Sequence, residues 1–150
     1  MKYLPLILIL LFPKIINAQS KPETEKWILE KYNEYRTEEK YDDDIMGIKE
    51  GYLSDTMAYL DVRVKIDAIK SFAFTLKNYD NPYIEFRINF DPGKLEYKAD
   101  DSTFKISKNK NDVYLTFRLK KEFFDDGMKE KMEQAFLHLI NLHGGNAVIN

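Results

Sequence analysis

The chain has 150 residues, of which 44% are hydrophobic and 32% are charged. This composition supports a folded core and excludes disordered, collagen-like and low-complexity chains. The 23 basic and 25 acidic residues give a formal net charge of −2, which does not indicate a nucleic-acid-binding protein, so we expect no nucleic-acid partner. The chain has no cysteine, and this excludes a disulfide framework and a lipid-modified amino-terminal cysteine.

The first 18 residues have the order of a secretory signal peptide. Lys2 precedes the apolar run Leu4–Phe12, and a short segment then ends at Ala18, before the polar Gln19. The run is shorter than the roughly 20 residues that span a bilayer, although a retained anchor is the alternative. We predict cleavage near Ala18-Gln19, export to the periplasm or the medium, no transmembrane anchor in the mature chain, and one globular domain over residues 19–150.

The segment that follows this leader carries the signals of a helix. Ser20 and Glu23 have the spacing of a capping box, in which the two side chains satisfy the first backbone N–H groups. Trp27, Ile28 and Tyr32 follow at helical spacing. These signals predict a first helix from about Lys21 to Arg36.

Between Ile45 and Lys120 the hydrophobic period changes to two, which is typical of strands with one apolar and one polar face. A short strand near 45–52 begins this region, and short turns at 78–82, 91–94 and 109–112 join neighbouring strands. Short links favour antiparallel neighbours, so we predict a meander of about six strands. The apolar faces comprise Ala58, Leu60, Val62, Val64 and Ile66; Phe72, Phe74 and Leu76; Ile84, Phe86, Ile88 and Phe90; Phe104 and Ile106; and Val113, Leu115, Phe117 and Leu119.

A second helical pattern begins after Phe124, where Asp125 or Asp126 is available as the cap. Gly144-Gly145 ends the pattern as a carboxy-terminal cap. Its amphipathic stripe predicts a helix that packs on the apolar side of the sheet. The stripe consists of Met128, Met132, Ala135, Phe136, Leu139, Ile140 and His143.

The order of helix, sheet and helix predicts an α+β fold with an antiparallel meander sheet or partial barrel. The amphipathic helix at the carboxy terminus closes one end or one face of that sheet. A pleckstrin-homology-like shape has this order of elements. A helix-grip arrangement, in which a curved sheet wraps a long terminal helix, is the alternative.

Motifs for catalysis, cofactors or metals are missing from the sequence. There is no thiol nucleophile, no G-x-S-x-G elbow, and no glycine pattern for a nucleotide. His138 and His143 are about 140° apart on a helix and cannot share a metal as neighbouring turns do. Asp42, Asp44 and Gly47 fit part of a calcium-loop register, but Leu53 stands where a ligand is required. We therefore predict a non-catalytic protein without cofactor or metal, while an enzyme that uses a carboxylate pair stays open.

The polar faces of the predicted strands carry an excess of basic residues. Arg63, Lys65, Lys77, Arg87, Lys105, Arg118 and Lys120 are expected to point outward, against Asp61 and Glu85, whereas residues 19–44 hold five basic and nine acidic residues. Tyr59, Tyr83 and Tyr114 share the outward side and could stack on a sugar or another planar group. Such a surface suits an acidic glycan, a lipid headgroup or an acidic protein surface. The candidate face consists of Arg63, Lys65, Arg87, Lys105, Tyr114 and Arg118.

That face has two simpler interpretations. Lysine, arginine and tyrosine are common on strand exteriors because they keep a sheet soluble and protect its edges. The acidic first helix could also pack against the basic residues. The primary hypothesis is a binding module for an anionic partner.

The apolar side of the sheet supports an alternative function. Aromatic and thioether side chains could line a cavity between the sheet and the last helix, which would make the protein a carrier of a small apolar ligand. A filled core is the simpler interpretation of the same residues. The candidate lining consists of Phe74, Phe86, Phe117, Met132 and Phe136.

The whole sequence resembles small exported bacterial proteins of unknown function. The resemblance is carried by the junction Ala18-Gln19 and by the ending Ala135–Ile140 with Gly144-Gly145. It covers most of the chain, and it implies no activity and no site residue.

Overall fold

Helix α2 (Lys21–Tyr35) begins at the capping box that the sequence predicts. The backbone N–H and the hydroxyl of Ser20 each donate to the Glu23 carboxylate at 2.8 Å. Both hydrogen bonds hold the pKa of Glu23 below its ordinary value, and the bond from the backbone N–H has the larger effect. The helix buries one side, with Ile28 and Tyr32 fully enclosed.

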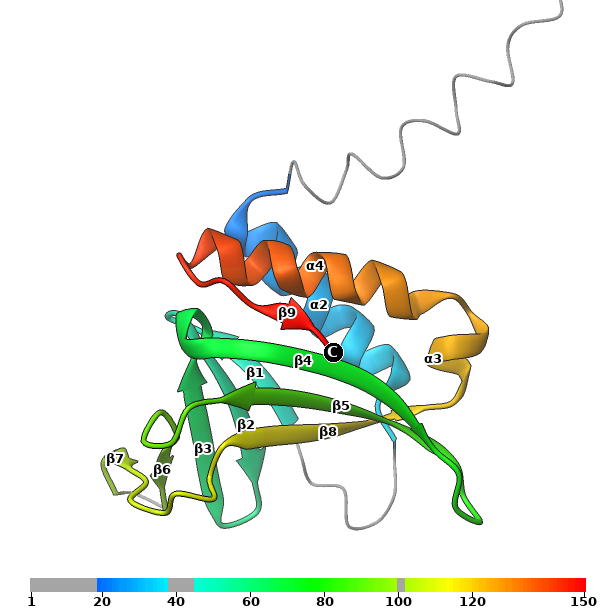
Figure 1. The fold of residues 1–150 in the computed structure, drawn as a ribbon. Coiled ribbons are helices and arrows are strands. Elements are labelled where there is room, and N and C mark those ends of the chain that lie inside the picture. Colours follow the sequence, from blue (N-terminus) through cyan, green and yellow to red (C-terminus); the bar gives the residue numbers. More distant parts are fainter. Residues whose placement is uncertain (1–18, 38–44, 100–101) are drawn as a thin grey trace, which may run out of the picture.

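The computed structural model describes residues 19–37, 45–99 and 102–150 (Figure 1).

Three strands after this helix form a meander with two-residue turns. They are β1 (Ile45–Lys49), β2 (Tyr52–Met57) and β3 (Leu60–Lys65). Glu50 and Gly51 have φ angles of 53° and 81°, the left-handed pair that a tight hairpin requires. Ala58 and Tyr59 form the second turn, so these two residues do not lie on the strand faces that the alternation predicts for them.

The short 3₁₀ helix η1 (Ile66–Ala68) carries the chain into a second sheet. This sheet contains β4 (Ile69–Lys77), β5 (Tyr83–Phe90) and β8 (Tyr114–Lys120), and β5 runs antiparallel to both β4 and β8. The chain end adds β9 (Val148–Ile149), which runs parallel to β4. The strand order is β8-β5-β4-β9.

Between β5 and β8 the chain returns to the first sheet. It forms β6 (Glu96–Lys98), which pairs with β3, and then β7 (Lys105–Ile106), which pairs with β6. The first sheet therefore has the order β1-β2-β3-β6-β7. The described residues form nine strands in two sheets and no closed barrel, where the sequence predicts one meander of about six strands.

The last helix is α4 (Met128–Leu142), which follows the single turn α3 (Glu122–Asp125). Gly127, with a φ angle of 65°, is its amino-terminal cap residue in place of the predicted Asp125 or Asp126. Asp126 instead accepts a 2.7 Å hydrogen bond from the Tyr35 hydroxyl, which connects α2 to this turn. That bond, together with burial, raises the pKa of Tyr35 to about 12.

Helices α2 and α4 lie on the apolar side of β4, β5 and β8, as Figure 1 shows. The predicted stripe of α4 is buried from Met128 to Ile140, and the apolar residues of β4, β5 and β8 meet it. An α+β fold with antiparallel sheets and a carboxy-terminal helix packed on a sheet is therefore confirmed. No helix within the described ranges combines the length and the apolar character needed to cross a membrane. The predicted leader, residues 1–18, lies outside the described residues.

Candidate functional site

Arg63, one of the predicted basic residues, is held by three neighbours on the outer side of the first sheet. Its guanidinium forms a salt bridge with Glu96, with Nη2 and Nε each 2.7 Å from Oε2. The same group lies 4.0 Å from the ring centre of Tyr52 and 3.7 Å from that of Phe104. Because the cation and Glu96 are mostly buried together, this cluster joins β3, β6 and the segment before β7.

The position of Phe104 corrects the predicted faces of its strand. The alternation predicts Phe104 and Ile106 inside and Lys105 outside. In the structure Phe104 lies on Arg63, and Ile106 is 62% exposed. Lys105 is opposite Tyr97, which is opposite Val62, so Lys105 shares the inner side of this sheet. Lys105 is thus separated from Arg63 and from Lys65, which is exposed on the outer side.

The remaining candidates gather on the outer side of the second sheet. Arg87 on β5 lies 3.9 Å from the ring centre of Tyr114 on β8, and Arg118 on β8 lies 4.8 Å from that of Tyr83 on β5. Arg118 is opposite Glu85, and Arg87 is two residues further along β5, so the arginines occupy diagonal positions. Each arginine thus stacks on a tyrosine of the other strand. We call these four residues the arginine–tyrosine surface.

The charge around this surface is positive. Glu85 is the one acidic residue on the outward positions of β4, β5 and β8, all of which the structure describes, and Lys77 lies 3.3 Å from its carboxylate. Lys120 adds a further basic residue opposite Tyr83. The six predicted face residues are thus divided: Arg87, Tyr114 and Arg118 come together, whereas Arg63, Lys65 and Lys105 belong to the other sheet.

A groove of about 630 Å³ borders the same surface at the turn between β4 and β5. Tyr79 in this turn is 68% exposed and stacks on Tyr83, with ring centres 6.0 Å apart and planes inclined by 22°. Asn78, Asp80 and Asn81 line the groove together with Arg118. The groove therefore combines an exposed ring with amide, carboxylate and guanidinium groups.

The predicted apolar lining is a filled core in the structure. Phe74 and Phe86 stack at 4.2 Å, and Phe86 also meets Phe136 edge-on at 5.1 Å and Phe117 at 6.3 Å. The gap between α2 and the side chains of Phe74, Phe86 and Met132 is too small to hold a water molecule. The carrier hypothesis stays a prediction, and a ligand at this place would require the helices to move away from the sheet.

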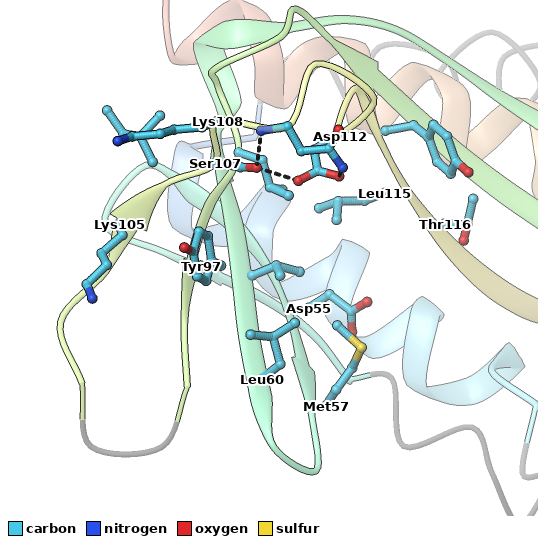
Figure 2. A pocket seen from close by; sticks show the side chains of 15 residues that line it. Asp55, Met57, Leu60, Tyr97, Lys105, Ser107, Lys108, Asp112, Leu115 and Thr116 are labelled. Carbon is cyan, nitrogen blue, oxygen red and sulfur yellow. Dashed lines mark hydrogen bonds between the residues drawn. The ribbon is translucent and has the colours of Figure 1, made fainter.

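An open cleft of about 950 Å³ lies elsewhere, between the inner side of the first sheet and the start of β8. Figure 2 shows Leu60 and Tyr97 on one side of it and Leu115 on the other. Asp55 on β2 lies in its wall and is 5% exposed. Met57, Leu60, Val62, Leu95 and Leu115 make the wall mainly apolar.

The loop between β7 and β8 forms the upper rim of this cleft in Figure 2. The Ser107 hydroxyl donates to one oxygen of Asp112, and the Asn109 amide donates to the other at 2.9 Å. The backbone N–H of Asn109 donates to the Ser107 hydroxyl at 3.2 Å. The carboxylate of Asp112 thus organises the loop. Lys105 and Lys108 also line the cleft, and both residues are exposed.

Comparisons with models of known protein families, with curated proteins and with solved structures gave no match. The resemblance to small exported bacterial proteins therefore stays a prediction.

The two histidines contact different parts of the amino-terminal segment. His138 Nε2 lies 3.0 Å from the carbonyl oxygen of Gln19, and His143 Nε2 lies 3.3 Å from a carboxylate oxygen of Glu25. Both therefore connect α4 to α2 or to the residues before it. Within the ranges that the structure describes, no three His, Asp or Glu side chains are grouped to hold a metal ion. Asp42 and Asp44 of the tested calcium-loop register lie outside those ranges, whereas Gly47 and Leu53 lie in β1 and β2.

Sequence reasoning missed Asp55, Tyr79 and the cleft. Asp55 alternates with Leu53 and Met57, so an acid in an apolar register was the signal available for it. Tyr79 lies in the predicted turn at residues 78–82, where the alternation of the strands does not indicate the direction of a side chain. The cleft depends on the pairing of β6 with β3, which is remote in sequence.

Proposed function

We propose that the protein is a non-catalytic binding module that contacts an anionic partner through the arginine–tyrosine surface. The observation that carries this proposal is the diagonal arrangement of Arg87 over Tyr114 and Arg118 over Tyr83. Two arginines on adjacent strands present their charge to the same side of the sheet. The outer side of β3 and β6 supports the proposal less well, because Arg63 is bound to Glu96 and Lys98 lies 3.1 Å from Asp61.

Stacking on tyrosine suits a guanidinium for anion binding. The ring contacts the face of the guanidinium, whereas an oxyanion binds to the N–H groups in its plane. The contact also restricts the side chain before binding, so less conformational entropy is lost when the partner arrives. A carboxylate, sulfate or phosphate that bridges Arg87 and Arg118 is the matching chemistry.

Among the three anionic partners that the sequence suggests, the groove favours an acidic glycan. The exposed Tyr79 ring offers a flat apolar surface to a sugar ring, and Asn78 and Asn81 offer amide groups to sugar hydroxyls. Arg118 lines the same groove and would meet an acidic substituent. A lipid headgroup uses the arginines without the ring, and an acidic protein surface has no need of the groove.

Calorimetric titration with two oligosaccharides tests the proposal. A sulfated heparin hexasaccharide and a hexamer of galacturonic acid supply the two types of anionic group, and the neutral maltohexaose is the negative control. We expect binding of an acidic hexamer that weakens with ionic strength and falls by about tenfold or more in the Arg87→Glu/Arg118→Glu variant. The single variant Tyr79→Ala should also weaken the binding, because it removes the exposed ring on which a sugar would stack.

The matched control is Lys65→Glu/Lys94→Glu, which changes the net charge by the same amount on exposed residues of the other sheet region. Equal loss of affinity in both double variants would show that only overall charge matters and would overturn the assignment. Binding only to anionic vesicles would replace the glycan with a lipid headgroup. Arg63 is kept unchanged because its replacement would disturb the contacts with Glu96 and Phe104.

Signal-peptide cleavage and export of the chain stay predictions. Export to the periplasm or the medium would place the surface where acidic glycans are present. The pleckstrin-homology-like shape, with the helix-grip shape as its alternative, stays a prediction, and the proposed function depends on neither. The alternative carrier function is supported less well, because the described gap lined by Phe74, Phe86 and Met132 is filled.

A further inference from the structure

We propose that the open cleft between β8 and the inner side of the first sheet binds a single-chain amphiphile, a molecule with one apolar chain and one anionic headgroup. This site is separate from the arginine–tyrosine surface and does not depend on it. The cleft volume of about 950 Å³ is within the range of small-molecule sites. Its wall and its rim differ in chemistry, and this difference defines the ligand.

The wall of the cleft suits an apolar chain. Met57 and Leu60 are only half-buried, although they continue the apolar faces that Leu53 and Val64 bury completely further along β2 and β3. Leu95, in the segment before β6, and Leu115, on β8, complete the wall. Contact with water at Met57 and Leu60 forfeits the favourable free energy of burial, about 25 cal/mol per Å² of apolar surface. An apolar chain in the cleft would recover it.

The charged groups of the cleft orient the ligand. Lys105 and Lys108 are exposed at the rim, and neither forms an ion pair within the described part of the chain. Asp55 lies in the wall, and Figure 2 shows it on the other side of Leu60 from Lys105. Both oxygens of Asp112 are used by Ser107 and Asn109. An anionic headgroup is therefore attracted to the lysine rim, and the apolar chain extends toward Met57 and Leu60.

Dodecanoate below its micelle concentration is the probe that tests this site. We expect calorimetric titration to show one molecule bound per chain. Dodecyltrimethylammonium, with the same chain and the opposite charge, should bind at least about tenfold more weakly. The methyl NMR signals of Met57, Leu60, Val62 and Leu115 should shift, whereas those of the filled core should not. Absence of dodecanoate binding, equal binding of both amphiphiles, or shifts confined to other residues would overturn the proposal.

Two kinds of variant separate the rim from the wall. The Lys105→Glu/Lys108→Glu variant should bind dodecanoate about tenfold or more weakly than the wild type. The Lys65→Glu/Lys94→Glu variant, with the same change of charge, should bind it with unchanged affinity. Leu60→Trp should fill the cleft and abolish binding without loss of thermal stability. Equal effects of the two charge variants, or full binding by Leu60→Trp, would contradict the site.

The source of the ligand and the independence from the proposed function are tested in the same series. A free acid should bind as a monomer, so binding to phosphatidylglycerol vesicles without binding of monomeric dodecanoate would overturn the proposal. The Arg87→Glu/Arg118→Glu variant should bind dodecanoate normally while it loses the acidic hexasaccharide. Loss of dodecanoate binding in this variant would contradict a separate site.

Discussion

Strand β8 passes from a filled interior to an open cleft within five residues. Leu119 and Phe117 are enclosed by α2 and the neighbouring strands, whereas Leu115, on the same side of the strand, lines the cleft. Strand β2 changes in the same way from Leu53, which is fully buried, to the half-buried Met57. The difference shows that an alternating pattern defines an apolar face but not what covers it. Helices cover one part of this face and leave Met57 and Leu60 partly exposed at the cleft.

The largest expected effect contrasts one residue from each region. Phe86→Ala should lower the free energy of unfolding by about 3–5 kcal/mol, because Phe86 is packed against four other rings and its loss leaves a cavity. Leu60→Ala should cost about 1 kcal/mol or less, because water already reaches this side chain. Urea unfolding followed by circular dichroism measures both values. Equal costs would mean that the cleft is closed in solution.

The second prediction concerns the close approach of the chain end to η1. A Cβ atom at Gly145 would lie 2.7 Å from Ile140 Cγ2 and 3.0 Å from the Asp67 backbone Cα. Gly145→Ala should therefore cost about 1–3 kcal/mol through overpacking. Gly93→Ser is an informative control, because its φ angle of 76° is strained for a side chain but no atom lies within 4 Å of its Cβ position. A Gly145 variant as stable as the wild type would show that the chain after α4 does not approach η1 this closely.

The third prediction concerns the outer side of the cleft wall. Arg63→Met should cost about 1–2 kcal/mol, because it removes two cation–π contacts and the salt bridge with Glu96. Hydrogen exchange should become faster in β6 and β7 and stay unchanged in α4. Faster exchange throughout the molecule would contradict the local role of this cluster. Arg87→Met, which removes one cation–π contact, is the matched control and should change stability less.

The smallest predicted effect is at the contact between α2 and the end of α3, where the Tyr35 hydroxyl donates to Asp126. Tyr35→Phe should cost about 0.5–1.5 kcal/mol at neutral pH. The folded-state pKa of Tyr35 is raised from 10.0 to about 12, so this contribution is complete below pH 10 and is lost as the pH rises through about 12. Unfolding of both proteins as a function of pH measures it. A stability difference that grows over this pH range would contradict the hydrogen bond as its cause.

Local patterns predicted the elements that pack against one another along the chain. The capping box at Ser20 and Glu23 marked the start of α2, and the alternation of Ile84, Phe86, Ile88 and Phe90 matched the burial of β5. These patterns are strong because each element buries one continuous face. The strand order was harder to predict, because β6 has only three residues and pairs with β3 across a gap of about 30 residues in the sequence.

Some side-chain placements depended on long-range partners that the alternation does not contain. Phe104 has the apolar character of an inner residue, yet Arg63 attracts its ring to the outer side of the sheet. Ile106 is consequently exposed and Lys105 lies at the cleft. The pairing of Arg87 with Tyr114 required the register of β5 and β8, which no local pattern gives.

The most direct test of the central claim is an amide NMR titration with the acidic hexasaccharide that binds more tightly. Chemical-shift changes concentrated at residues 79–89 and 114–120 are the predicted result, because these segments carry Tyr79 and the arginine–tyrosine surface. Changes centred on Arg63 and Lys65, or uniform small changes over the whole chain, would contradict the claim that this surface binds the anionic partner.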